Sequence, residues 1–77
     1  DTLLHESSHA FSYLNRNCVA PDGNNKRQQA QEYFGSEELF ADSLVLYFGG
    51  DYVFYRETKS LSDAENAYLQ EFINLCT

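Results

Sequence analysis

Apolar residues recur at helical spacing along most of this chain, and the first such stretch covers residues 2–15. A loop follows over residues 17–25, which contain the only proline, an Asp-Gly pair and several asparagines. Residues 26–33 are polar and rich in helix formers, which predicts a short, exposed helix. The first helix is expected to pack into a domain through an apolar side made of Leu3, Leu4, Ala10, Phe11 and Leu14.

A buried helix is predicted over residues 36–48. Ser36 is a good N-cap, and carboxylates in the first turn, from Glu37 and Glu38, suit the positive end of the helix dipole. The rest of the segment is apolar on most sides, so we expect it to lie in the core. The pair at residues 49–50, Gly-Gly, is expected to end the helix.

The C-terminal part of the chain predicts one further helix and at most one short strand. Residues 51–56 have the composition of a strand or an extended segment, but no other strand is predicted to pair with them. Ser62 and Glu65 form the sequence pattern of a capping box, so the last helix is expected to begin near Ser62 and end at Cys76. The fold class is therefore mainly α, in a single domain. The expected inward residues of the last helix are Ala64, Ala67, Tyr68, Phe72 and Leu75.

The composition limits the size and the partners of this domain. A core made from 77 residues usually needs a disulfide, a metal ion or a partner for stability. The net charge is −7 and the five basic residues form no dense patch, so we expect neither nucleic acid nor an anionic membrane as a partner. No apolar stretch approaches the roughly 20 residues of a membrane span.

Cys18 and Cys76 are the only cysteines. If they are bridged, they close a loop of about 58 residues. The resulting loss of entropy in the unfolded chain stabilises the fold by about 4 kcal/mol. The alternative is two buried free thiols in a reducing compartment. We favour the disulfide, and with it a secreted protein.

The most informative motif is His-Glu-x-x-His at residues 5–9. On a helix, residues four apart project from the same face, so His5 and His9 can share one Zn²⁺ ion. Glu6 would face the open coordination position and act as a general base and then a general acid. His5 and His9 are also the only histidines of the chain. The motif predicts a zinc metallopeptidase.

A catalytic zinc ion needs a third protein ligand, and here it must be a carboxylate because no histidine or suitable thiol is left. Glu37 and Glu38 are the candidates. Asp42 favours Glu38, because residues four apart share a helix face and a charge in an apolar helix needs a partner. We expect Asp42 to orient a histidine ligand through its outer ring nitrogen. Glu37 lies about 100° away on the helix and is expected to face solvent.

These two motifs resemble those of gluzincin-type metallopeptidases, most closely the anthrax lethal factor and Pro-Pro endopeptidase group. The second motif of that group, Glu-Phe-Phe-Ala-Glu, is similar to residues 38–42, Glu-Leu-Phe-Ala-Asp. The end of its domain is similar to residues 68–73. The resemblance implies a small zincin-like helical domain with an active-site helix, a glutamate-ligand helix and a C-terminal helix. It also implies Zn²⁺ as the cofactor.

In that group a tyrosine seven residues before the glutamate ligand stabilises the oxyanion, and Gln31 occupies this position here. Tyr33 is the nearest tyrosine, and the resemblance implies that it takes this role. Tyr47, Tyr52 and Tyr55 remain open as alternatives. The predicted function is zinc-dependent hydrolysis of a peptide or protein substrate.

A metallopeptidase usually holds its substrate on an edge strand that precedes the active-site helix, and no such strand is predicted here. We therefore expect the chain to be either the C-terminal part of a larger zincin catalytic domain or a compact relic of one. Another chain could supply the missing part. The alternative function is a small, secreted, acidic domain whose zinc site is structural or vestigial and which binds a protein partner.

Overall fold

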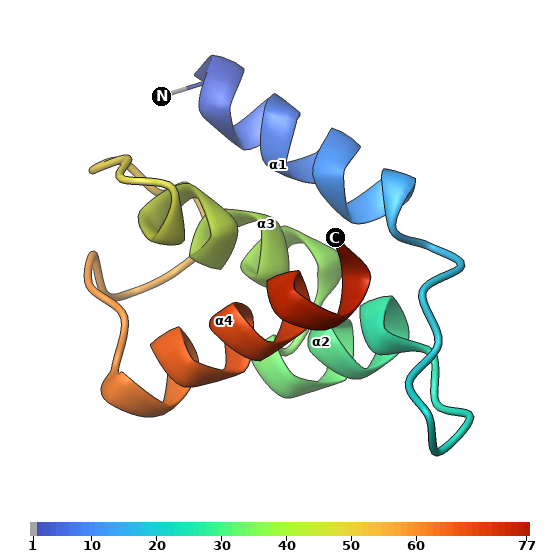
Figure 1. The fold of residues 1–77 in the computed structure, drawn as a ribbon. Coiled ribbons are helices and arrows are strands. Elements are labelled where there is room, and N and C mark those ends of the chain that lie inside the picture. The colour runs from blue at the N-terminus through green and yellow to red at the C-terminus, as the bar shows by residue number, and fades with distance from the viewer. Residues whose placement is uncertain (1) are drawn as a thin grey trace.

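The computed structural model describes residues 2–77, and this part of the chain is mainly helical, with four α-helices and no sheet (Figure 1). Helix α1 spans Thr2–Leu14, α2 spans Lys26–Phe34, α3 spans Glu37–Tyr47 and α4 spans Asp63–Cys76. An isolated antiparallel bridge between Val19 and Asn25 is the strand-like pairing found in the described residues. The predicted mainly-α fold class is confirmed.

The two predicted N-caps are present at the starts of α3 and α4. At the start of α3, the Ser36 hydroxyl oxygen accepts a hydrogen bond from the Leu39 backbone N–H. At the start of α4, Ser62 and Glu65 form a complete capping box. Each pairing satisfies a backbone N–H that has no partner within the helix. The beginnings of α3 and α4 are therefore determined locally.

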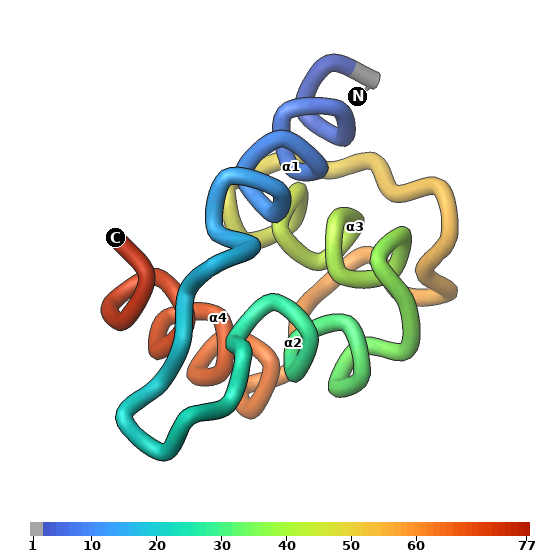
Figure 2. Tube along the Cα trace, turned by 90° about the vertical axis from the view of Figure 1, so that its right-hand side faces the viewer, coloured from blue at the N-terminus to red at the C-terminus, as the bar shows by residue number. Residues whose placement is uncertain are grey.

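Helix α3 is the central element, with α1 on one side and α2 and α4 on the other (Figures 1 and 2). Residues 40–45 of α3 are all buried. The apolar core lies on the α2–α4 side, where the Phe40 and Phe72 rings meet edge to face with centroids 5.4 Å apart. Burying a large aliphatic or aromatic side chain of this kind contributes about 1.5–3 kcal/mol to the free energy of unfolding. The fully buried residues of this cluster are Ala30, Phe40, Leu44, Leu69 and Phe72.

Helix α1 does not pack through the face that its apolar residues predicted. Its buried residues are His5, Ser8 and Ser12, whereas Leu3 and Leu14 are 77% and 76% exposed. Small serine side chains on this face allow α1 to approach α3 closely. The Ser8 hydroxyl donates to the backbone carbonyl of Leu4 on the same helix, and the Ser12 hydroxyl donates to Glu37 on α3. The prediction of an apolar contact face was therefore wrong for most of its residues. Only two of them, Leu4 and Phe11, are half-buried, while Ala10 is exposed.

The C-terminal third differs from the prediction in the register of its helix. Of the two alternatives for residues 51–56, a strand or an extended segment, the strand is absent, and the backbone amides of residues 54–56 donate to the buried Asp42 side chain of α3. Helix α4 is turned relative to the predicted register: Phe72 is buried and Tyr68 half-buried as expected, but Leu69 is buried as well. The remaining three predicted inward residues, Ala64, Ala67 and Leu75, are exposed.

The predicted disulfide is present and joins Cys18, in the loop after α1, to Cys76 at the end of α4. It ties the end of α4 to the loop after α1, and the Phe11 ring of α1 lies 6.1 Å from the Phe72 ring of α4 between their centroids. None of the helices in residues 2–77 combines the length and the apolarity needed to cross a membrane.

Removing the disulfide should destabilise the protein substantially. The bridge spans 58 residues of sequence, so the double variant Cys18→Ser/Cys76→Ser should lose about 4 kcal/mol of unfolding free energy. Urea unfolding of the oxidised parent and the variant measures this difference. Intact mass before and after reduction provides the control, and two titratable thiols in the freshly isolated parent would contradict the assignment.

Candidate metal centre

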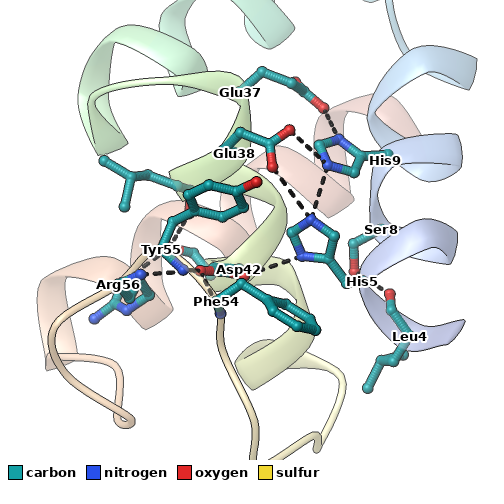
Figure 3. A network of polar contacts seen from close by, with 12 residues as sticks. Leu4, His5, Ser8, His9, Glu37, Glu38, Asp42, Phe54, Tyr55 and Arg56 are labelled. Atoms are coloured by element: carbon teal, nitrogen blue, oxygen red, sulfur yellow. Dashed lines mark hydrogen bonds and ion pairs between the residues drawn. The ribbon is translucent and has the colours of Figure 1, made fainter. Parts of the chain in front are cut away.

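Three side chains that can bind a metal ion converge between α1 and α3. His5 and His9 project from one face of α1, and Glu38 comes from the first turn of α3 (Figure 3). One ligand atom from each lies within 4.8 Å of the other two. The two imidazole Nε2 atoms are 3.0 Å apart, and Glu38 oxygens lie 3.0 Å from Nε2 of His9 and 3.4 Å from Nε2 of His5. This group could hold a metal ion.

A carboxylate fixes the outer nitrogen of each imidazole. Nδ1 of His5 lies 3.0 Å from Asp42, and Nδ1 of His9 lies 2.7 Å from Glu37 (Figure 3). A carboxylate can only accept hydrogen bonds, so each Nδ1 carries the proton and donates it. A ring that carries no second proton then presents a lone pair on Nε2 towards the other ring. The carboxylates thereby select the tautomer with the proton on Nδ1, in which Nε2 can bind a metal ion.

When neither ring carries a second proton, three electron-rich atoms meet without a donor between them. Two Nε2 lone pairs and the Glu38 carboxylate point to one place, and this arrangement is repulsive unless a cation occupies it. The cation can be a metal ion or an added proton on one imidazole. Two nitrogens and one carboxylate oxygen, with room for a further ligand in an open cleft, match the donor set of catalytic zinc sites.

Asp42 links the His5–His9–Glu38 group, a candidate metal-binding group, to the segment after α3. This residue is completely buried in the middle of α3, and the expected contact with the outer nitrogen of a histidine is present. Its second oxygen, Oδ2, accepts the backbone N–H groups of Phe54, Tyr55 and Arg56. Burying a carboxylate is costly unless it is fully hydrogen-bonded, and here four donors surround it. Asp42 therefore positions His5 and residues 54–56 together.

Glu37 does not face solvent, and that prediction was wrong. Its carboxylate is partly buried against α1 and accepts from His9, from the Ser12 hydroxyl and from the Gln31 amide. Burial alone would raise the pKa of Glu37, but hydrogen bonds from Gln31, His9 and Ser12, with the nearby Arg27 charge, hold that pKa below its usual value. Glu37 is therefore ionised at neutral pH and orients His9 as Asp42 orients His5.

An open cleft of about 680 Å³ lies over the three candidate ligands. Glu6 is exposed and lines this cleft, as the motif predicts. Tyr55 also lines it, and its hydroxyl points to the Glu38 side of the site (Figure 3). The Glu38 carboxylate, as a hydrogen-bond acceptor and as a negative charge, raises the pKa of Tyr55, so this hydroxyl keeps its proton at neutral pH. The other residues lining the cleft are Tyr13, Arg27, Glu37 and Phe54.

The structure does not bring Tyr33 to this cleft, which corrects its assignment as the oxyanion donor. The ring of Tyr33 stacks on Tyr68 of α4, with centroids 4.1 Å apart, and lines a separate shallow hollow. Tyr47 donates its hydroxyl to Gln70, and Tyr52 packs against Phe54. Of the four tyrosines considered from the sequence, Tyr55 is the one that lines the cleft.

Two features of the site carried little signal in the sequence. Tyr55 lies in a segment with the composition of a strand, and the sequence offered it only as one of three alternatives to Tyr33. Glu37 has the appearance of an ordinary helix-start acid. Its contact with His9 depends on how α1 crosses α3, which the spacing within one helix does not reveal.

Comparisons with protein-family models, with curated proteins and with solved structures found no match.

Substitution of Glu38 should weaken Zn²⁺ binding more than substitution of the other two acids of the site on α3, Glu37 and Asp42. Glu38→Gln removes an anionic ligand and should cost several orders of magnitude in affinity. Asp42→Asn and Glu37→Gln each remove a partner of a histidine ligand and should cost about 10–100-fold. Competition with a chromogenic chelator, on variants shown to be folded by circular dichroism, measures the three affinities.

Glu71→Gln is the matched control, because Glu71 is exposed on α4. It should bind Zn²⁺ as the parent does. If Glu37→Gln also bound Zn²⁺ like the parent, the contact between Glu37 and His9 would have no role in orienting the ligand.

Proposed function

We propose that this protein hydrolyses peptide bonds with a zinc ion held by His5, His9 and Glu38. The observation that carries the proposal is the convergence of two Nε2 lone pairs and a carboxylate on one point, with both outer nitrogens held by carboxylates. Such second partners are typical of metal-binding histidines. The open cleft over the group supports a catalytic site in preference to a closed structural one.

When bound, Zn²⁺ polarises a carbonyl group and lowers the pKa of water towards about 7. The remaining steps belong to residues of the chain. Glu6 lines the cleft beside both histidines and is exposed, so its carboxylate can reach a water molecule there. It takes a proton from the attacking water and passes it to the leaving amine nitrogen.

Tyr55 is the proposed donor to the developing oxyanion. Its hydroxyl stays protonated and faces the cleft, and Asp42 holds its backbone N–H. A donor whose backbone is fixed before substrate binds needs little reorganisation during the reaction. The same carboxylate that orients His5 therefore also places the oxyanion donor.

The dimensions of the cleft support a peptide as the proposed substrate. A volume of about 680 Å³ lies within the roughly 300–1,000 Å³ usual for ligand sites. The aromatic rings of Tyr13, Phe54 and Tyr55 provide apolar walls beside the polar centre. We also propose an extracellular location, because disulfides persist in oxidising compartments.

Glu6→Gln should retain Zn²⁺ and lose hydrolysis, because Gln cannot carry the proton and Glu6 is not among the three metal-ligating residues. Digestion of a mixed peptide library by the zinc-loaded parent and variant, followed by mass spectrometry, compares them. Equal cleavage at equal zinc content would remove Glu6 from the mechanism. Stoichiometric zinc in a parent that cleaves nothing, and unfolds on chelation, would favour the alternative in which the site is structural.

Tyr55→Phe should lower kcat by about 100-fold with little change in zinc content, since it removes one oxyanion donor. Tyr33→Phe is the matched control, because the same atom is removed outside the cleft. Steady-state kinetics on a peptide found in the library measure both variants. An unchanged kcat in Tyr55→Phe would contradict the role assigned to this hydroxyl.

A further inference from the structure

Arg27 brings a positive charge into a cleft that otherwise carries acids. Among the described residues it is the only lysine or arginine lining this cleft, whose acids are Glu6, Glu37 and Glu38. Arg27 lies in the first turn of α2, and its side chain reaches back to α1, where Nε donates to the Ser12 hydroxyl at 2.9 Å. Its guanidinium carbon lies 5.7 Å from the centre of the Tyr13 ring.

The guanidinium is held in place but keeps donors for a ligand. A guanidinium has five N–H donors, and in the described structure the Nε–H of Arg27 makes its only hydrogen bond. The nearest oxygen of Glu37 is 3.6 Å from a terminal nitrogen, which is an ion pair beyond hydrogen-bond distance. That carboxylate already accepts from His9, Ser12 and Gln31. The terminal N–H groups of Arg27 are therefore available in the cleft.

We propose that Arg27 binds a carboxylate of the substrate, so that the protein prefers peptides with an acidic group near the scissile bond. The proposal rests on the proposed peptide hydrolysis. A planar guanidinium binds a carboxylate through two parallel hydrogen bonds, and one that is already fixed loses less entropy on doing so. The carboxylate can belong to an Asp or Glu side chain or to the C-terminus of the peptide.

The position of Arg27 limits where this carboxylate lies in the substrate. Glu37 contacts both His9 and Arg27, so the guanidinium sits beside the His9 edge of the metal-binding group. An extended peptide advances about 3.3 Å per residue. Because one carboxylate, that of Glu37, contacts both the guanidinium and His9, this rise places the acidic group within about two residues of the scissile bond. The overall charge of −7 provides no general attraction for acidic peptides, so the preference must be local.

Peptide binding to zinc-loaded Glu6→Gln protein tests the proposal without requiring turnover. Fluorescence anisotropy compares peptides that differ only by Glu or Gln at successive positions, and by a free or an amidated C-terminus. We expect one acidic peptide to bind about 10–100-fold more tightly than its neutral counterpart. The position scan and the C-terminal pair separate the two sources of the carboxylate. The same ratio should appear in kcat/KM of the active protein.

Arg27→Gln should remove the difference between acidic and neutral peptides, and Arg27→Lys should retain part of it. Arg16→Gln is the matched control, because Arg16 stacks on the same Tyr13 ring, at 4.1 Å, but does not line the cleft. It should keep the full preference. A purely structural role for Arg27 would weaken all peptides equally, so an unchanged ratio in Arg27→Gln would overturn the proposal.

The test separates this proposal from that of hydrolysis. Cleavage by the parent without any preference for acidic peptides would overturn the role of Arg27 and leave hydrolysis standing. An acidic preference that depends on Arg27, in a parent that cleaves nothing, would establish the carboxylate site and overturn hydrolysis. Neither binding nor cleavage of any peptide would overturn both.

Discussion

The buried carboxylate of Asp42 is the interaction on which the rest of the site depends. An isolated charge in the interior of a protein costs several kcal/mol, and Asp42 avoids this cost by accepting from His5 on one oxygen and from three backbone amides on the other. Because these donors come from α1 and from residues 54–56, the carboxylate joins three separate segments. Asp42 therefore contacts both His5 and the backbone of Tyr55.

The candidate metal centre lies between α1 and α3, and the apolar core lies on the opposite side of α3. Serines, histidines and carboxylates meet between α1 and α3, where Ser8 and Ser12 donate to oxygen acceptors and each histidine Nδ1 has a carboxylate partner. The apolar core lies between α3, α2 and α4, and the disulfide ties α4 to the loop after α1. This division keeps the polar groups apart from the apolar core, so the core is not interrupted by them.

Local signals predicted the helices well and their packing poorly. Ser36 and Ser62 begin α3 and α4 as expected, since a cap requires only neighbouring residues. The apolar residues of α1 were a poor guide, because α1 packs through its polar face and leaves Leu3 and Leu14 exposed. Residues 51–56 had the composition of a strand, but their amides pair with a side chain, which no periodicity of the segment itself reveals.

The sequence by itself determined which groups share a face: His5 with His9 on one helix, and Glu38 with Asp42 on another. It also showed that Asp42 needs a buried partner, because its neighbours on the helix are apolar. The tertiary structure decided that Glu37 meets His9, that Tyr55 and not Tyr33 faces the cleft, and that Arg27 lines it. Helical spacing specifies angles within one helix, whereas these contacts depend on how α1, α2 and the segment after α3 cross α3, which only packing establishes.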